Sequence, residues 1–193
     1  MNVLAILLAA GSATRFGSDK LLHALPHEVP IAVQAARHLK VVFGPNMLVV
    51  VRPGADALSD RLREENCKVI VCDNAAEGMG ASLACAARAA AHADAFVVAL
   101  ADMPFIRSST IAAVRDALAA GAPLVAPYFR ARRGHPVGIS AKFRSELEAL
   151  RGDEGARKVV AANEAGLVKI PVGDPGVLRD IDTPQDLVAR VIV

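Results

Sequence analysis

The chain has 193 residues, of which 53% are hydrophobic and only 4% aromatic, and it has no tryptophan. A chain of this length usually forms one domain, which buries about 70% of the surface that the unfolded chain exposes. Lys and Arg number 22 and Asp and Glu number 20, for a net charge of +2. No strong overall field therefore attracts nucleic acid or an anionic membrane. We expect a single domain over residues 1–193 that binds neither.

The three cysteines, Cys67, Cys72 and Cys85, do not form a predicted disulfide or zinc site. If the run from Cys67 to Cys72 is a strand, these two lie about 16 Å apart on opposite faces, too far for a disulfide. The spacing of the three is not that of zinc ligands. The apolar run from Val3 to Ala10 is far shorter than a membrane helix, and no Lys or Arg precedes it as in a signal peptide. We therefore expect buried, inert thiols in a cytoplasmic protein.

Short apolar runs alternate with segments of helical character over the first two thirds of the chain. The predicted strands are Val3 to Ala9, Met47 to Arg52, Cys67 to Cys72, Ala95 to Ala101 and Leu124 to Pro127. The predicted helices between them are Ile31 to Val42, Ala55 to Glu65, Ala81 to His92 and Ser109 to Ala120. This alternation is typical of a mostly parallel sheet with helices on both faces. It predicts a doubly wound α/β core.

The pattern changes after Pro127. A basic turn, Arg130 to Pro136, leads into a short strand that starts at Val137. The remaining predicted elements are helices at Ala141 to Leu150 and Ala156 to Asn163, a short apolar run at Leu167 to Val172 and a last helix at Thr183 to Val191. No linker of flexible composition separates this part, so it is predicted to extend the same sheet.

The first predicted strand runs into a loop of small residues between Gly11 and Lys20. Open α/β sheets bind ligands at the carboxyl ends of their strands. Small residues let backbone N–H groups approach a phosphate, and Arg15 and Lys20 supply positive charge. The loop fits a polyphosphate, although the same residue types also form ordinary turns. The five residues between Gly11 and Gly17, and the distance on to Lys20, exclude a Walker loop; the dinucleotide-binding fingerprint fails as well.

Asp102 directly follows the fourth predicted strand. A carboxylate at this point lies beside the N-terminal loop and offers the hard oxygen ligand that Mg²⁺ needs in phosphate chemistry. The alternative is an Asp that only caps the following turn.

A second acidic segment lies near the end of the chain, where Asp180 and Asp182 flank Ile181. The alternation predicts that both carboxylates point the same way. Helix-start signals explain the residues that follow, Thr183, Pro184 and Asp186, but do not require the two earlier aspartates.

Two other segments carry weaker signals. Gly78, Gly80 and Ser82 could let a nucleotide lie against the backbone, or simply form a glycine turn and the start of a helix. Three arginines precede His135, namely Arg130, Arg132 and Arg133. Such a run is usually a solvated face, and a lone histidine is usually structural. Beside a phosphate-binding core, however, the arginines would dock a second anionic substrate, since Arg pairs bidentately with phosphate.

The N-terminal loop resembles the signature of nucleotidyltransferases with a glycosyltransferase-A-like fold, at positions Leu8, Ala9, Ala10, Gly11, Arg15, Gly17 and Lys20. The resemblance spans Leu4 to Leu187 and is strongest to the MobA-like and MocA-like NTP transferases, in particular the molybdenum cofactor cytidylyltransferases. Two departures are Gln185, where glutamate is usual, and the absence of a Gly-Lys pair in the segment after Leu22.

The resemblance implies a Rossmann-like, three-layer α/β domain with a mostly parallel central sheet. It implies nucleotide binding by Leu8, Ala9, Ala10, Gly11, Arg15, Lys20, Gly78, Gly80 and Ser82. Asp102 and Asp182 would hold Mg²⁺, with Lys20, Arg15 and Asp102 as the catalytic residues. An acceptor would bind at Arg133, His135 and Asp180.

The implied reaction is transfer of a nucleoside monophosphate, CMP from CTP, to a phosphorylated pterin acceptor such as molybdopterin, with release of pyrophosphate. Ala10 favours cytosine, because guanylyltransferase relatives usually carry glycine there. The alternatives are a GTP-using or methylerythritol-phosphate-type transferase, or a non-catalytic nucleotide-binding maturation factor for a molybdoenzyme. A molybdoenzyme is the protein client that this family implies.

Overall fold

The structure is a computed structural model, which describes residues 1–11 and 19–187. Its strands are β1 (Val3–Ala9), β2 (Met47–Val51), β3 (Lys68–Val71), β4 (Ala95–Leu100), β5 (Leu124–Phe129), β6 (Arg132–Arg133), β7 (Val137–Ser140) and β8 (Leu167–Pro171). Its α-helices are α1 (Ile31–Phe43), α2 (Asp56–Glu64), α3 (Met79–Ala89), α4 (Ser108–Ala119), α5 (Arg144–Glu148) and α6 (Gly155–Ala162). Each predicted strand of the first two thirds is present within two residues of its predicted ends.

The strands form one mixed, mostly parallel sheet of eight strands in the order β3-β2-β1-β4-β7-β5-β6, with β8 paired to β5. β1 pairs in parallel with β2 on one side and with β4 on the other. The antiparallel strands are β6 and β7. Because the chain leaves β1 toward β2 and β3 and returns to β4, the strand order reverses at β1. Such a reversal is where open α/β sheets bind ligands. The predicted fold class is confirmed.

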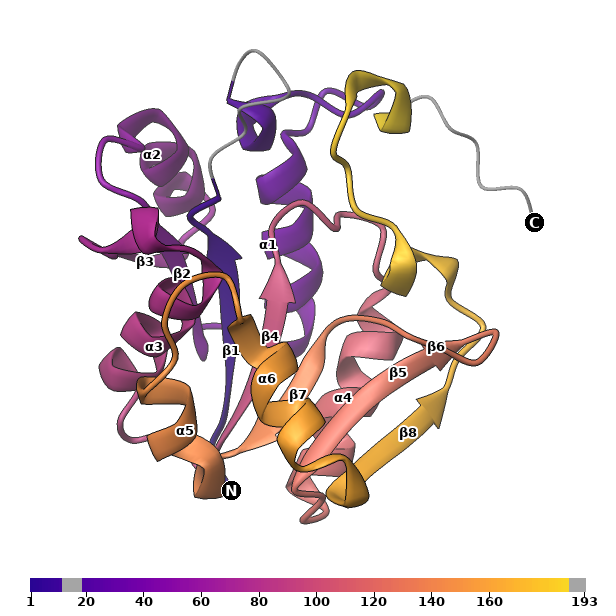
Figure 1. The fold of residues 1–193 in the computed structure, drawn as a ribbon. Helices are drawn as coiled ribbons and strands as arrows, with labels where there is room; N and C mark the ends of the chain where they lie inside the picture. The colour runs from indigo at the N-terminus through magenta and orange to yellow at the C-terminus, as the bar shows by residue number, and fades with distance from the viewer. Residues whose placement is uncertain (12–18, 188–193) are drawn as a thin grey trace.

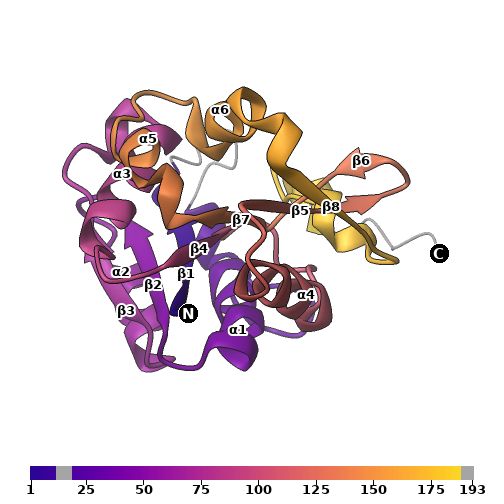
Figure 2. The same ribbon diagram turned by 90° about the horizontal axis from the view of Figure 1, so that it is seen from below.

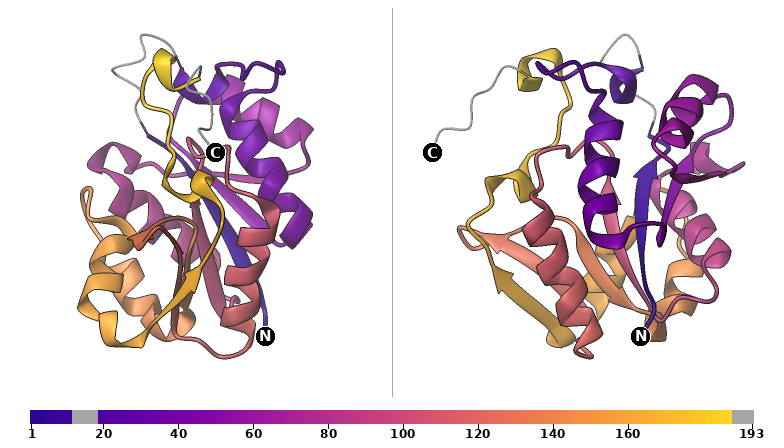
Figure 3. Two further views of the ribbon diagram at one scale, coloured as in Figure 1. Left: turned by 90° about the vertical axis from the view of Figure 1, so that its right-hand side faces the viewer. Right: turned by 180° about the vertical axis from the view of Figure 1, so that it is seen from behind.

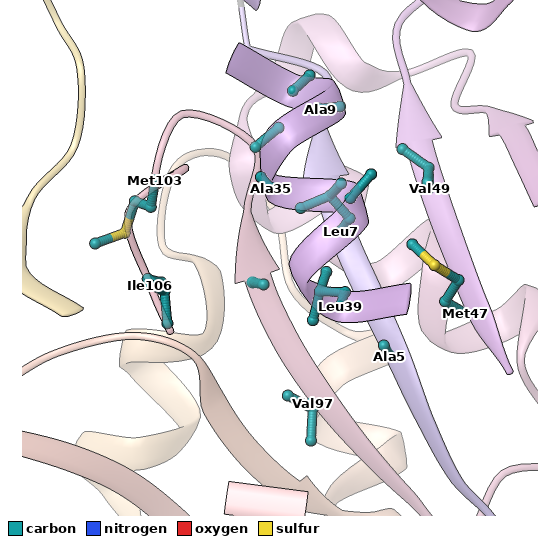
Figure 4. Packing of buried hydrophobic residues seen from close by; sticks show 14 of the residues in the cluster. Ala5, Leu7, Ala9, Ala35, Leu39, Met47, Val49, Val97, Met103 and Ile106 are labelled. Atoms are coloured by element: carbon teal, nitrogen blue, oxygen red, sulfur yellow. The ribbon is translucent and has the colours of Figure 1, made fainter. Parts of the chain in front are cut away.

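Helices cover both faces of the sheet, so the domain has three layers, as seen from below (Figure 2). The two adjacent strands β1 and β2 are wholly apolar and buried at every position. Its side chains alternate between the faces: Ala5 and Leu7 pack under α1, while Ile6 and Leu8 pack under α3. Figure 4 shows the first of these clusters, with Leu39 of α1 over the strands.

Two predicted helices differ from the observed ones because side chains and glycines set their ends. Helix α3 begins two residues before the predicted Ala81, directly after Gly78, and ends at Ala89. Beyond it, the Arg144 guanidinium donates to the carbonyls of Ala87, Ala90 and Ala93. The first of these bonds satisfies a carbonyl that a longer helix would have paired, and the other two satisfy carbonyls beyond the end of the helix. The predicted helix Ala141 to Leu150 is a 3₁₀ turn, Ala141–Phe143, followed by the short α5.

The predicted basic turn is largely a β-hairpin. Arg132 and Arg133 form β6 and pair with Phe129 and Tyr128 of β5. The two residues between the strands, Arg130 and Ala131, both have positive φ (48° and 62°). Positive φ at both central residues matches the twist of a tight hairpin.

The segment after β8 is fixed to the start of α4 by one buried carboxylate. Asp174 accepts hydrogen bonds from the N–H groups of Arg107 and Gly176 and from the hydroxyl of Thr110. The chain then rises to a 3₁₀ turn at Pro184–Leu187, where we predicted a helix from Thr183 to Val191. The last part of that prediction lies outside the described residues. Figures 1 and 3 show this segment, in yellow, reaching the edge of the sheet at which β1 and β4 end.

The three cysteines are free, as predicted. Burial raises the pKa of the Cys67 thiol, and it raises the pKa of Cys72 to about 11, with a further contribution from the neighbouring Cys85 thiol. These two thiols are therefore protonated and unreactive at neutral pH. In the described part of the chain, no helix has the length and apolar character needed to cross a membrane.

Candidate active site

A cavity of about 770 Å³ opens at the carboxyl ends of the parallel strands, at the reversal of strand order. Its volume lies within the range of about 300–1,000 Å³ that is usual for small-molecule sites. Residues that follow β1, β2, β3 and β4 line it, together with the start of α3: Leu8, Ala10, Gly11, Lys20, Leu21, Arg52, Pro53, Asp73, Ala75, Ala76, Gly78, Met79, Ser82, Leu100, Asp102 and Asp153.

Lys20 joins two carboxylates at the edge of this cavity. Its Nζ lies 3.0 Å from Asp102 Oδ2 and 3.1 Å from Asp182 Oδ1. Both contacts have the length of charge-assisted hydrogen bonds. The structure thus brings together the predicted catalytic lysine and both predicted metal ligands, from three distant parts of the chain.

Backbone hydrogen bonds place the three groups. Asp102 follows β4, and its carbonyl accepts the N–H of Ile181 at 2.9 Å. Ile181 is fully buried, which turns Asp182 outward toward the ammonium. On the other side, Asp19 accepts the N–H of Leu21 and starts the 3₁₀ turn that carries Lys20. The site therefore rests on secondary structure more than on its own ion pairs.

Opposing effects act on the pKa of Lys20. Partial burial lowers this pKa, but the charge of Asp102 and the hydrogen bonds to Asp102 and Asp182 outweigh burial and raise it above its ordinary value. The ammonium is consequently charged at neutral pH.

Asp186 holds the turn that presents Asp182. Its Oδ2 accepts from the N–H groups of Asp182 and Thr183 and from the Thr183 hydroxyl. These hydrogen bonds, those from Thr183 first, lower the pKa of Asp186. We predicted only a favourable charge in the first turn of a helix; the structure shows that the carboxylate caps the turn directly.

The donor set fits a divalent cation. Asp102 and Asp182 both contact the Nζ atom of Lys20, so the two carboxylates are neighbours. Within residues 1–11 and 19–187, no group of three or more His, Cys, Asp and Glu side chains is arranged to hold a metal. Two protein carboxylates, completed by phosphate and water oxygens, are the usual ligand set for Mg²⁺ in phosphate chemistry.

Gly78 and Gly80 lie against a neighbouring loop of the protein. A Cβ on Gly78 would be 2.3 Å from Asp153 Oδ1, and a Cβ on Gly80 would be 2.7 Å from the Arg151 carbonyl oxygen. The Gly80 N–H also donates to the Gly152 carbonyl at 2.7 Å. Gly78 still lines the cavity, whereas Gly80 is not among its lining residues in the described chain. Both glycines thus have a packing role that the sequence did not indicate.

A smaller cavity of about 250 Å³ adjoins the first. The two share the lining residues Leu8, Met79, Leu100 and Asp153. The predicted acceptor residues Arg133 and His135 line the smaller cavity, and so do Glu154 and Arg157. The cavity that contains the predicted acceptor residues therefore adjoins the cavity that contains the predicted nucleotide residues.

His135 is held as a neutral imidazole. Burial of the ring, and then the charge of Arg133, lower the pKa of His135 to about 4, against an opposing effect of Asp180. Its Nδ1 is buried and has no hydrogen-bond partner among the described residues. Asp180 and Asp182, predicted to point the same way, meet different groups: Asp180 acts on His135 and Asp182 on Lys20.

Of the remaining residues predicted to bind the nucleotide, some line the larger cavity and one is buried in the core. Leu8, Ala10 and Gly11 line the larger cavity, while Ala9 is buried in the core beneath α1. Ser82 lines the cavity from α3, and its hydroxyl donates to the Gly78 carbonyl. Arg15 lies outside the described residues.

Three charged lining residues were not predicted: Arg52, Asp73 and Asp153. Arg52 directly follows β2, and Asp73 comes two residues after β3. Their position after parallel strands was the signal that identified Asp102, and it could have identified them too. Asp153 gave no such signal, because its place at the cavity depends on a contact with the Met79 N–H, far away in sequence.

Residues 5–167 match the MobA-like NTP transferase domain. The chain belongs to the MobA-like NTP transferase family. This confirms the predicted resemblance and the nucleotidyltransferase class. The matched range ends before Asp182, so the geometry alone connects that residue with the site.

Relatives of nearly the same length share the family. The chain is 30% identical over 195 residues to nicotine blue oxidoreductase of Paenarthrobacter nicotinovorans, covering 96% of this chain and 94% of that protein. It is 28% identical over 207 residues to the purine catabolism protein PucB of Bacillus subtilis, covering 98% and 97%.

The fold is similar to that of crystal structures of Rv0371c from Mycobacterium tuberculosis. One has a TM-score of 0.84 at 25% sequence identity and covers 96% of this chain and 94% of that one. Another, a complex with manganese, has a TM-score of 0.80 at 23% identity and covers 96% of each chain.

Proposed function

We propose that this MobA-like transferase moves a nucleoside monophosphate, CMP from CTP, onto a phosphorylated pterin acceptor of the molybdopterin or molybdenum cofactor type and releases pyrophosphate. The observation that carries the proposal is the convergence of Lys20, Asp102 and Asp182 at the edge of the larger cavity. A site that only binds a nucleotide has no need for two carboxylates beside the phosphates, whose charge would repel them.

In the proposed complex, the triphosphate lies along the Gly11 turn. A Cβ on Gly11 would meet no heavy atom of the described residues within 4 Å, so these residues leave room for phosphate beside the backbone. Lys20, together with Arg15, offsets the charge that develops on the triphosphate. Asp102 and Asp182 would hold Mg²⁺, which would supply charge neutralisation and orientation for the phosphate oxygens. The manganese bound by the similar fold of Rv0371c supports a divalent cation in this role.

The acceptor occupies the smaller cavity, with its phosphate directed toward the larger one. An oxygen of that phosphate attacks the α-phosphorus in line, and pyrophosphate leaves. No protein base is required, because a phosphate monoester with a second pKa of about 6 is largely ionised at neutral pH. Arg133 supplies positive charge, whereas the neutral His135 offers hydrogen bonding to the acceptor without adding charge.

An assay matrix of triphosphates and acceptors tests the proposal. Purified protein with Mg²⁺ is mixed with CTP, GTP, ATP or UTP, and with molybdopterin, molybdenum cofactor or methylerythritol phosphate. Pyrophosphate release and product mass are then measured. We expect pyrophosphate and a dinucleotide product from CTP with a pterin acceptor, and none when the acceptor is omitted.

The matrix also separates the alternatives. A product only with GTP or with methylerythritol phosphate would replace the proposed substrate pair. Saturable nucleotide binding without pyrophosphate from any pair would indicate a maturation factor for a molybdoenzyme. Since one relative is named an oxidoreductase, the same protein is assayed for oxidation of nicotinamide cofactors. We expect none, because the Gly11 turn does not fit the dinucleotide-binding fingerprint.

A further inference from the structure

Lys20 occupies the position between the two carboxylates that a bridging divalent cation would take. We propose that Lys20 is an internal counter-ion of the Asp102–Asp182 pair, which disfavours metal binding to the free protein and leaves the pair when a triphosphate binds. The triphosphate part of this inference rests on the proposed function, whereas the exclusion of metal by Lys20 does not.

The two carboxylates are brought together without the help of Lys20. The hydrogen bond from the Ile181 N–H to the Asp102 carbonyl ties the two segments together through the backbone. The Asp186 carboxylate fixes the turn that follows Asp182. Replacing Lys20 by a neutral residue is therefore expected to leave a pair of neighbouring anions without their counter-ion.

The ammonium and a metal ion cannot both lie between Asp102 Oδ2 and Asp182 Oδ1. A small divalent cation holds its oxygen ligands at about 2.0–2.1 Å. The Lys20 Nζ already lies 3.0 and 3.1 Å from the same two oxygens. A cation that entered between those oxygens would overlap this atom and be repelled by its charge. A metal ion that bridges these two oxygens thus requires Lys20 to move.

The larger cavity offers space for the Lys20 side chain. This side chain, which is 12% exposed, lines the same cavity as Gly11, where the proposed triphosphate lies. Phosphate oxygens there would replace the carboxylates as partners of the ammonium and would free Asp102 and Asp182 for the metal. Metal and triphosphate should therefore strengthen each other's binding by the same factor, since coupling between two ligands is reciprocal.

Titration of the full-length, nucleotide-free protein with Mn²⁺, followed by electron paramagnetic resonance, tests the exclusion directly. We expect Lys20→Met and Lys20→Gln to bind Mn²⁺ about tenfold more tightly than wild type, because removing a cation in direct contact with both carboxylates strengthens their field. Lys20→Arg, which keeps the charge, should bind as weakly as wild type. Lys68→Met, a change of the same charge on the exposed edge strand, is the matched control and should have no effect.

The double variant Lys20→Met/Asp182→Asn should lose the gain, because one of the two carboxylates is then neutral. Mn²⁺ binding that is unchanged or weaker in both neutral Lys20 variants, with circular dichroism showing folded protein, would overturn the inference. The titration contains no nucleotide, so its outcome does not depend on the pyrophosphate assay. A protein without transferase activity could still show the gain, and an active transferase could fail to show it.

Discussion

Two glycine turns border the larger cavity, and they use their missing side chains differently. At Gly11, an added Cβ would meet no heavy atom of residues 1–11 and 19–187 within 4 Å. At Gly78, it would lie 2.3 Å from Asp153 Oδ1, and Gly78 also has a φ of 124°. The first turn leaves space beside the backbone, while a neighbouring loop fills the second. Glycines that look alike in sequence can thus differ in structure, one beside open space and the other packed against a neighbouring loop.

The ion pairs of the candidate site lie on the open side of the cavity, the side of Gly11, whereas Gly78 lies on the packed side. Lys20, Asp102 and Asp182 make ion pairs at an open edge, where Asp182 is 56% exposed. At the second glycine turn, the Gly80 N–H donates a hydrogen bond to the Gly152 carbonyl, so the neighbouring loop packs against the start of α3. Substitutions on the open side should therefore change chemistry with little effect on folding, and those on the packed side should change stability first.

The largest effect is expected on the open side. Asp102→Asn should reduce turnover by roughly 10²–10³-fold, the loss typical of removing one group that stabilises charge in the transition state. Pyrophosphate release gives the rate, and urea denaturation should show little change in the free energy of unfolding. Asp60→Asn, an exposed change on α2, is the control and should keep full activity. Unchanged turnover in Asp102→Asn would contradict the placement of the metal site.

On the packed side, Gly78→Ala should lower the free energy of unfolding by about 2–3 kcal/mol, because a side chain is strained at this φ and overlaps the 151–153 loop. Urea denaturation measures the loss. Gly173→Ala, where a Cβ would meet nothing within 4 Å, is the control and should change stability by less than about 0.5 kcal/mol. Equal stability of the two variants would show that the turn is not closed in solution.

Because His135, at the smaller cavity, has a lowered pKa, we expect the free energy of unfolding to depend on pH. Its pKa is lowered from 6.5 to about 4 in the folded protein, so the unfolded chain takes up a proton first as the pH falls. This contribution to stability is complete above pH 6.5 and is lost between about pH 6.5 and 4. The loss between pH 7 and 5 is up to about 2 kcal/mol.

Urea denaturation across this pH range is the measurement for His135. The groups that act on it, Arg133 and Asp180, stay in place while His135→Gln removes the titrating ring. The variant should flatten the pH profile, whereas His27→Gln, at an exposed position, should leave the slope unchanged. An identical slope in wild type and His135→Gln would show that the ring is not buried in solution.

The smallest effect should come from Gly11→Ala. The added methyl group touches none of the described residues, so we expect the free energy of unfolding not to change. It would nevertheless stand where the proposed triphosphate approaches the backbone, and triphosphate binding measured by calorimetry should weaken by about tenfold, or about 1.4 kcal/mol. A loss of stability here as large as that of Gly78→Ala would remove the contrast between the two turns.

The centre of the sheet could be predicted because strands such as β1 and β2 are continuous apolar runs between helices, and their residues are buried on both faces. Asp102 could be predicted because it comes just after the apolar run that forms β4. The last predicted helix was wrong within the described residues, since Thr183 and Pro184 begin only a 3₁₀ turn. Signals for the start of a helix do not specify its length.

Contacts between distant segments could not be predicted from one sequence. The loop at 151–153 carries no local sign that it will cover Gly78 and Gly80, because the pattern of a strand or helix depends only on neighbouring residues. The same limit applies to Lys20. Its charge suggested phosphate binding, but its ion pair with Asp102 depends on the return of the chain to β4, and its ion pair with Asp182 depends on the segment after β8.

The distance of Asp182 from the rest of the ionic centre along the chain has a consequence for partial polypeptides. Asp182 lies beside Lys20 and Asp102 because Asp174 anchors the segment after β8 and the Ile181 N–H donates to the Asp102 carbonyl. A polypeptide that stops before this segment contains Lys20 and Asp102 but has neither the anchor nor the second carboxylate. Completion of the ionic centre thus requires the segment that follows β8.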